Sequence, residues 1–119
     1  MRFSADKGVT IENNWFHDFL GADGNLNHND YIQFWTAGTN TPSTNITIRG
    51  NLLANTSGTE SQAIFMADEA NNGTRFQNVL IERNFIENHH IHGITVNRAD
   101  GVVVRDNTMP VLQIGRAHV

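Results

Sequence analysis

One short pattern occurs four times in this chain, and every copy ends in an asparagine at the same position. The copies are Gly8–Asn14, Asn45–Asn51, Asn78–Asn84 and Gly101–Asn107. In each copy two apolar residues are separated by a single residue, and the asparagine stands three positions after the second apolar residue. Alternation indicates a strand with one buried face. Recurrence at a bounded but uneven interval indicates coils of chain stacked on one another.

A second set of strand-like segments lies between these copies. The segments are Tyr31–Trp35, Ala63–Ala67 and Gly93–Asn97, and each precedes one copy. Met1–Val9 aligns without a gap with Ile94–Val102, so the N-terminal part repeats the same arrangement. One coil is therefore expected to run strand, corner, strand, asparagine turn and return. The pattern predicts an all-β fold, a single-stranded solenoid of the parallel β-helix type with about three to four coils.

The repeated asparagines are expected to form a ladder. Asparagine tolerates the left-handed conformation of a sharp turn, and identical amides stacked one above another can hydrogen-bond in a column. The alternative is that asparagine merely favours turns. The residues two positions beyond the ladder are apolar and are expected to face the core. The four asparagines are Asn14, Asn51, Asn84 and Asn107, and the four apolar residues are Phe16, Leu53, Ile86 and Met109.

Composition excludes several classes of partner. The chain has no cysteine, so neither disulfides nor thiolate metal sites are available. Its formal net charge is -4, and Lys7 is its only lysine, which argues against a nucleic-acid partner. The sequence contains no apolar stretch long enough to cross a membrane.

Both ends of the chain are expected to be truncated. Met1 falls inside a strand, so residues 1–112 are interpreted as a piece of a longer solenoid whose adjoining coils are its partners. Ile114–Val119 matches the translation of a common sequencing adapter, so residues 113–119 are interpreted as a non-native tail. The alternative is a genuine polar tail.

Loops indicate where a ligand would bind. Long insertions at 15–29, 36–44 and 68–77 flank the interleaved strands, so the outer face of that sheet is the expected floor of a groove. Aligning the strands on their core isoleucines places an indole, an arginine and several polar groups on this face, a surface suited to an extended sugar polymer. The expected substrate-binding residues are Arg2, Gln33, Trp35, Phe65, Thr95 and Asn97.

Two clusters carry candidate catalytic groups. In the first, His28 supplies a base that titrates near neutral pH, Asp30 can orient it, and Tyr31 can shuttle a proton. The alternative is that Asp30 caps a turn and His28 lies on a solvated loop. In the second, His92 is a polar groove residue, and with His90 it offers two imidazoles. No third ligand stands at a fixed spacing, so corner residues are preferred to a zinc site.

No cofactor is expected, although calcium stays open. Asp68 and Glu69 leave the third coil on the groove side and could bind calcium through oxygen. The preferred interpretation is that they pair with other groups in solvent, since no Gly-Gly-x-Gly-x-Asp repeat is present.

The coils, covering roughly Met1 to Met109, resemble the right-handed parallel β-helix repeat family, the pectate-lyase-like superfamily that includes pectate lyases, alginate lyases and mannuronan epimerases. His28–Thr36, Asn45–Asn51 and His92–Val96 resemble bacterial secreted β-helix proteins of the alginate-epimerase-like kind. The resemblance implies a secreted or extracellular protein, at the cell surface or in the periplasm. It implies an acidic polysaccharide such as alginate or pectate as partner, and uronate lyase or epimerase chemistry.

Uronate chemistry would give the candidate residues provisional roles. Arg2 or Gln33 would stabilise the sugar carboxylate and its developing charge. His28 or Tyr31 would be the base, and His92 would be the proton donor. Two other interpretations stay open: a glycan-binding, tailspike-like module without catalysis, and a purely structural spacer.

Overall fold

The computed structural model describes residues 1–17, 30–36, 38–54, 62–87 and 93–110. These residues form strands and turns, and no helix occurs among them. In particular, the described part of the chain contains no helix that could cross a membrane. The strands are β1 (Arg2–Phe3), β2 (Lys7–Glu12), β3 (Trp15–His17), β4 (Asp30–Phe34), β5 (Thr44–Arg49), β6 (Leu52–Ala54), β7 (Gln62–Met66), β8 (Phe76–Glu82), β9 (Phe85–Glu87), β10 (Ile94–Val96) and β11 (Ala99–Arg105).

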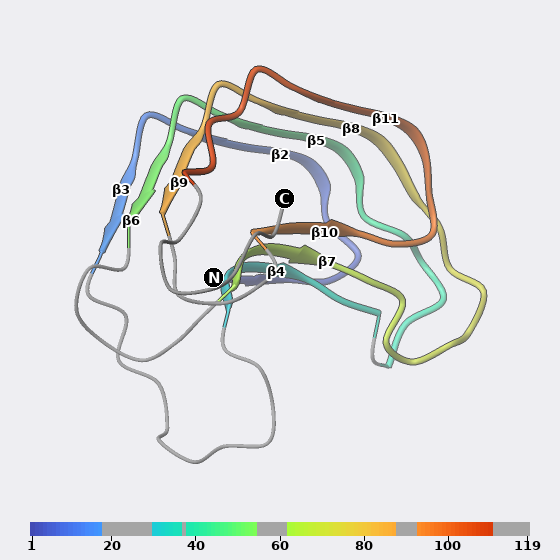
Figure 1. The fold of residues 1–119 in the computed structure, drawn as a ribbon. Helices are drawn as coiled ribbons and strands as arrows, with labels where there is room; N and C mark the ends of the chain where they lie inside the picture. The colour runs from blue at the N-terminus through green and yellow to red at the C-terminus, as the bar shows by residue number, and fades with distance from the viewer. Residues whose placement is uncertain (18–29, 37, 55–61, 88–92, 111–119) are drawn as a thin grey trace, which may run out of the picture.

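The strands form three parallel sheets. Their orders are β1-β4-β7-β10, β2-β5-β8-β11 and β3-β6-β9, so consecutive strands go to different sheets and each pass of the chain extends every sheet in turn. Figure 1 shows the three sheets side by side around a common interior. All pairings between these strands are parallel. The prediction of an all-β fold with stacked strands is confirmed, and the arrangement is compatible with a β-helix.

Strand register follows the sequence alignment. Val9 pairs with Ile46, Ile46 with Val79, and Val79 with Val102. In the first sheet Ile32 pairs with Ile64, and Ile64 with Ile94. The repeated pattern therefore aligns the coils without slippage, as expected where one face of each strand is buried.

The core is a stack of these inward side chains. Ile32, Ile48 and Ile64 have no measurable exposure, and Phe34 stacks on Phe3 with ring centroids 4.7 Å apart. Beyond the asparagines, Leu53 and Ile86 are buried and Phe16 packs against the core, as predicted. Met109 is 36 % exposed because it belongs to the outermost rung of the described residues.

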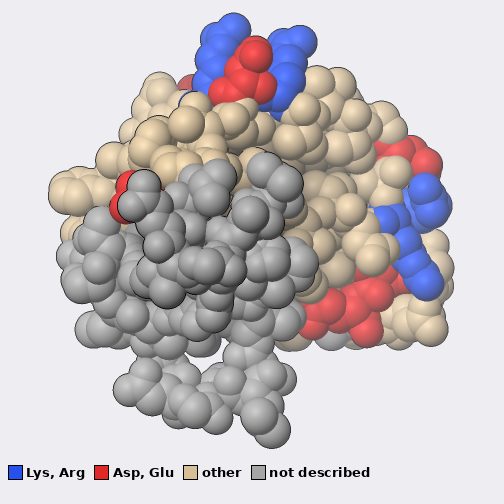
Figure 2. Space-filling model, viewed as in Figure 1, with Lys and Arg blue, Asp and Glu red and all other residues tan. Residues whose placement is uncertain are grey.

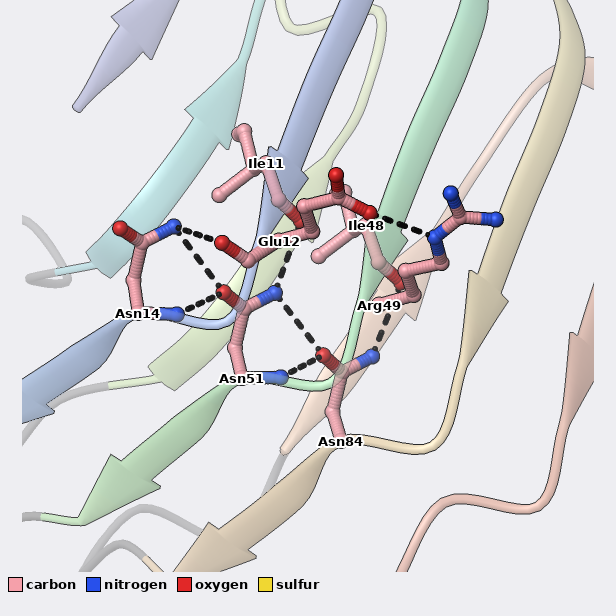
Figure 3. A network of polar contacts seen from close by, with 7 residues as sticks. All are labelled: Ile11, Glu12, Asn14, Ile48, Arg49, Asn51 and Asn84. Atoms are coloured by element: carbon pink, nitrogen blue, oxygen red, sulfur yellow. Dashed lines mark hydrogen bonds and ion pairs between the residues drawn. The ribbon is translucent and has the colours of Figure 1, made fainter.

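The asparagine ladder is present and runs through all four coils. The Nδ2 of each asparagine donates to the Oδ1 of the next: Asn14 to Asn51 at 3.2 Å, Asn51 to Asn84 at 3.0 Å and Asn84 to Asn107 at 2.9 Å. The same Oδ1 atoms accept the backbone N–H of the preceding rung's asparagine. Figure 3 shows three members of this column, Asn14, Asn51 and Asn84, between the second and third sheets. Asn51 and Asn84 are only 2 % and 1 % exposed. Their side-chain Nδ2 and Oδ1 atoms are all hydrogen-bonded, and each Nδ2 also donates to a backbone carbonyl.

The left-handed turn lies one residue earlier than predicted. The ladder asparagines are not among the residues with positive φ, whereas the residue before each of them is. An ordinary φ at the asparagine lets its amide point into the ladder, and the preceding residue makes the turn. Those preceding residues are Asn13 (φ 58), Gly50 (φ 65), Arg83 (φ 54) and Asp106 (φ 56). At Gly50 a Cβ would come within 2.6 Å of Asn13 Oδ1, so glycine also relieves crowding there.

A file of alternating charge runs beside the ladder. Glu12 pairs in register with Arg49, Arg49 with Glu82, and Glu82 with Arg105. Arg49 Nε lies 2.7 Å from Glu12 Oε2, and Arg105 Nε lies 2.9 Å from Glu82 Oε1. The hydrogen bond from Arg105 lowers the pKa of Glu82. Basic and acidic side chains gather accordingly at the top of the molecule in Figure 2.

The ladder is expected to dominate stability. Replacing Asn84 by Ala leaves the Asn51 amide and the Ile48 carbonyl without their partner. Because a buried unsatisfied group costs about 1–3 kcal/mol, we expect the free energy of unfolding to fall by about 2–5 kcal/mol in urea titrations.

The matched control is Asn78→Gly. Asn78 donates to Asn45 across neighbouring coils at 2.7 Å, but this pair is exposed, and glycine keeps the positive φ of 57°. The control should lose at most about 1 kcal/mol. Equal losses in the two variants would contradict a special role for the buried column.

Candidate functional site

The candidate site is the outer face of the β1-β4-β7-β10 sheet. Ile32 and Phe34 of β4 point into the core, so the residue between them faces outward. Register then places one file across four strands, in the order Arg2, Gln33, Phe65 and Thr95. These four predicted binding residues are therefore neighbours on one face.

Arg2, Gln33, Trp35 and Glu69 form a contact group that we call the Arg2 cluster. Arg2 Nε donates to Gln33 Oε1 at 3.1 Å, and Gln33 Nε2 donates to Glu69 Oε1 at 2.8 Å. The Arg2 guanidinium also lies 5.0 Å from the centre of the Trp35 ring, within the range of a cation–π contact. Gln33 is only 8 % exposed beneath these neighbours, whereas Arg2 remains exposed.

The cluster differs from the expected open surface in two respects. Trp35 is half-buried rather than exposed. Gln33 is held by a hydrogen bond at each end of its amide, so its orientation is fixed by Arg2 and Glu69. Glu69, expected to pair in solvent or to bind calcium, is instead the group that orients this amide.

The remaining binding residues extend the same face. Thr95 Oγ1 donates to Gln62 Oε1 at 3.3 Å, and Phe65 lies half-buried in the file between Gln33 and Thr95. Asn97 is exposed, and its backbone N–H donates to the carbonyl of Met66 at 2.8 Å.

The described residues include two of the four candidate catalytic groups, Tyr31 and Asp30. Tyr31 is 4 % exposed and packs in the core, where its hydroxyl donates to the Ala54 carbonyl at 3.3 Å. Its hydroxyl therefore does not lie beside the Arg2 cluster on the outer face. Asp30 begins β4, half-buried and in register with Gln62. His28, His90 and His92 lie outside the described residues.

Asp68 is a buried hub, which corrects the expectation of a solvated side chain. Its side chain has no exposed area. Its oxygens accept hydrogen bonds from Thr36 Oγ1, from the backbone N–H groups of Asn72 and Gly73, and from Arg98 Nη1. The hydrogen bond from Thr36 is the main cause of a lowered pKa, which the other donors reinforce against the opposing effect of desolvation. Asp68 thus ties together the turns that follow β4, β7 and β10.

A turn signal in the sequence marks this hub. Asp68 is followed by Asn71, Asn72 and Gly73, and an aspartate before such residues typically bonds the backbone a few positions on. Asn71 and Gly73 both have positive φ. The Thr36 contact is long-range in sequence, and no local pattern announces it.

Two arginines in the turns that follow β7 and β10 are neutralised by carboxylates. Arg98 pairs with Asp68 at 2.9 Å, and Arg75 pairs with Asp100 through Nε at 2.9 Å. Arg2 makes no ion pair with a carboxylate of the described residues. Its charge is therefore available to pair with a ligand. The described residues contain no group of three or more His, Cys, Asp or Glu side chains that could hold a metal ion.

Comparison with protein-family models, with curated proteins and with solved structures finds no match to this chain. The functional argument therefore depends on the geometry of the Arg2 cluster and on the residues around it.

Acid should weaken the Asp68 hub. Because the folded-state pKa is lowered, the carboxylate stabilises the fold fully above its ordinary pKa of about 4, and this contribution is lost as pH falls through the folded value. Asp68→Asn should lower the melting temperature by several degrees at neutral pH and flatten the decline in stability at acidic pH.

Asp100→Asn is the control for this experiment. Asp100 also has a pKa lowered by its arginine partner, but its side chain is 60 % exposed, so its ion pair is worth little. Thermal unfolding across acidic and neutral pH compares the two. Matching curves for the two variants would contradict the assignment of Asp68 as the hub.

Proposed function

We propose that this chain is part of a secreted, carbohydrate-active right-handed parallel β-helix that binds an acidic polysaccharide such as alginate or pectate on its β1-β4-β7-β10 face. The three parallel sheets, each extended once per pass of the chain, support the β-helix. Parallel strands joined by crossovers are right-handed in nearly all known cases, which supports the handedness.

The Arg2 cluster is the observation that carries the binding proposal. An exposed guanidinium held beside an aromatic ring can pair with a sugar carboxylate while the ring packs against the apolar face of the pyranose. Glu69 fixes the Gln33 amide, so the polar partner of Arg2 is already oriented before a ligand arrives. Such preorganisation reduces the entropy lost on binding.

The file has dimensions suited to a polymer. Rungs in a sheet are about 4.8 Å apart, so the three steps from Arg2 to Thr95 span about 14 Å along the stack. A surface of this length contacts several consecutive sugar units. Thr95 and Asn97, at the far end, offer hydroxyl and amide groups to sugar hydroxyls.

Uronate lyase or epimerase activity is the second candidate. Both reactions remove the proton next to a sugar carboxylate, and Arg2 with Gln33 could stabilise the charge that develops. His28 as base, Asp30 as its orienting group and His92 as donor remain assignments from residue type. Ultraviolet absorbance of an unsaturated uronate would mark a lyase. Inverted uronate stereochemistry in an intact polymer would mark an epimerase, and binding without either would mark a non-catalytic module.

Removing the Arg2 charge tests the binding proposal. Arg2→Ala should weaken binding of alginate or pectate by about tenfold or more, since a hydrogen bond to a charged group contributes about 1.5–3 kcal/mol. Binding of a neutral glucan should be nearly unchanged. Isothermal titration calorimetry on the full chain measures both.

Arg75→Ala is the matched control, because it removes an exposed guanidinium that already has Asp100 as its partner. It should leave the affinity for the acidic polymers unchanged. Failure of the unaltered chain to bind either acidic polymer, or equal losses in the two variants, would contradict the proposal.

A further inference from the structure

The last strand leaves apolar side chains uncovered at one end of the stack. Val102 and Val104 follow Val79 and Ile81 in register, and those two residues are buried at 1 % and 0 % exposure. Val102 and Val104 are 36 % and 47 % exposed although they occupy the same inward-facing files. Among the described residues no strand pairs with the outer side of β11, so its backbone groups can pair with a further strand.

The first coil carries the features that would continue the stack. The charge file ends in Arg105 at β11 and begins with Glu12 at β2, so Glu12 has the sign required to follow Arg105. The ladder has the same polarity throughout, since every Nδ2 donates toward the later coil. At the β11 end Asn107 would therefore donate, and at the β2 end the Oδ1 of Asn14 would accept.

The backbone is matched as well. Gly8 and Gly101 both have positive φ, at 75° and 68°, as do Ala5 and Arg98, each at 57°. The first and last coils therefore bend at the same positions. A second copy laid on β11 would meet a strand of the same shape as the one that each coil already meets within the chain.

We propose that copies of this chain stack end to end, with β2 of one copy pairing in parallel with β11 of another. Val9 and Ile11 would then follow Val102 and Val104 in the inward files, and Glu12 would follow Arg105 in the charge file. The two contacting surfaces differ, so the contact does not close on itself, and stacking continues into open-ended assemblies.

Two lysine substitutions on one strand test this proposal. Val104→Lys places a charge in an inward file, where a stacked copy would bury it. Val103→Lys places the same charge in the outward file of Leu80 and Thr47, where a stacked copy leaves it in solvent. The two valines are 47 % and 45 % exposed, so an isolated chain tolerates both changes alike.

Sedimentation velocity from micromolar to millimolar concentration is the readout. The unaltered chain and Val103→Lys should increase in mean mass with concentration, whereas Val104→Lys should stay monomeric. Circular dichroism checks that both variants are folded. A monomeric unaltered chain at every concentration, or equal association of the two variants, would overturn the proposal.

Disulfide trapping tests the register independently. The chain has no cysteine, so Glu12→Cys with Arg105→Cys introduces the only thiols. Within one chain these positions lie three rungs apart, about 14 Å, which is too far for a disulfide. Between stacked copies they are adjacent.

Oxidation of this double variant should give a ladder of covalent oligomers on a non-reducing gel. Lys7→Cys with Arg105→Cys is the control, because Lys7 lies at the other end of β2, and it should give little product. Dimers that form equally well with Arg105→Cys alone would show that copies meet through two β11 strands, and this result would overturn the end-to-end register.

Discussion

The stacking of the coils depends on one column of hydrogen-bonded asparagine amides, which is buried at Asn51 and Asn84. An asparagine placed at the same corner of each coil would destabilise the fold if its donors and acceptor were left unpaired. Stacking removes that cost, because the Oδ1 of Asn51 accepts a hydrogen bond from one coil and its Nδ2 donates one to the next. The column therefore stabilises only one alignment of the coils. A slip by a single residue would break the column and also turn the inward isoleucines to solvent.

That alignment positions the candidate site. Arg2 and Gln33 lie far apart in the sequence, and they meet because β1 and β4 are held in register. The turns at the end of the same sheet are joined by Asp68, which collects donors from Thr36 and Arg98 on neighbouring coils. Packing, buried polar contacts and surface chemistry are thus consequences of one repeated spacing.

The features that repeat from coil to coil could be predicted from the sequence, whereas contacts that occur only once could not. The inward files, the asparagine column and the Arg2-to-Thr95 file all follow from period-two alternation read across several copies. The position of the left-handed residue was wrong by one, because the pattern marks the asparagine but not which neighbour turns. The burial of Tyr31 and Asp68 depends on contacts with residues far apart in the sequence, such as Phe16 and Thr36 respectively. Gln33 is covered because Glu69 reaches it from a loop, and loop paths are not encoded in strand periodicity.

The alternating charge file restricts how such a chain can change in length. Each acidic side chain is followed in the next coil by a basic one, from Glu12 through Arg49 and Glu82 to Arg105. Deleting one inner coil would bring two arginines or two glutamates face to face, whereas deleting a pair would keep opposite signs together. Gene duplication that lengthens the stack would likewise have to add an even number of coils to keep opposite charges paired. Variants that differ by an even number of coils would retain this electrostatic pairing, and odd ones would have to replace a charged residue first.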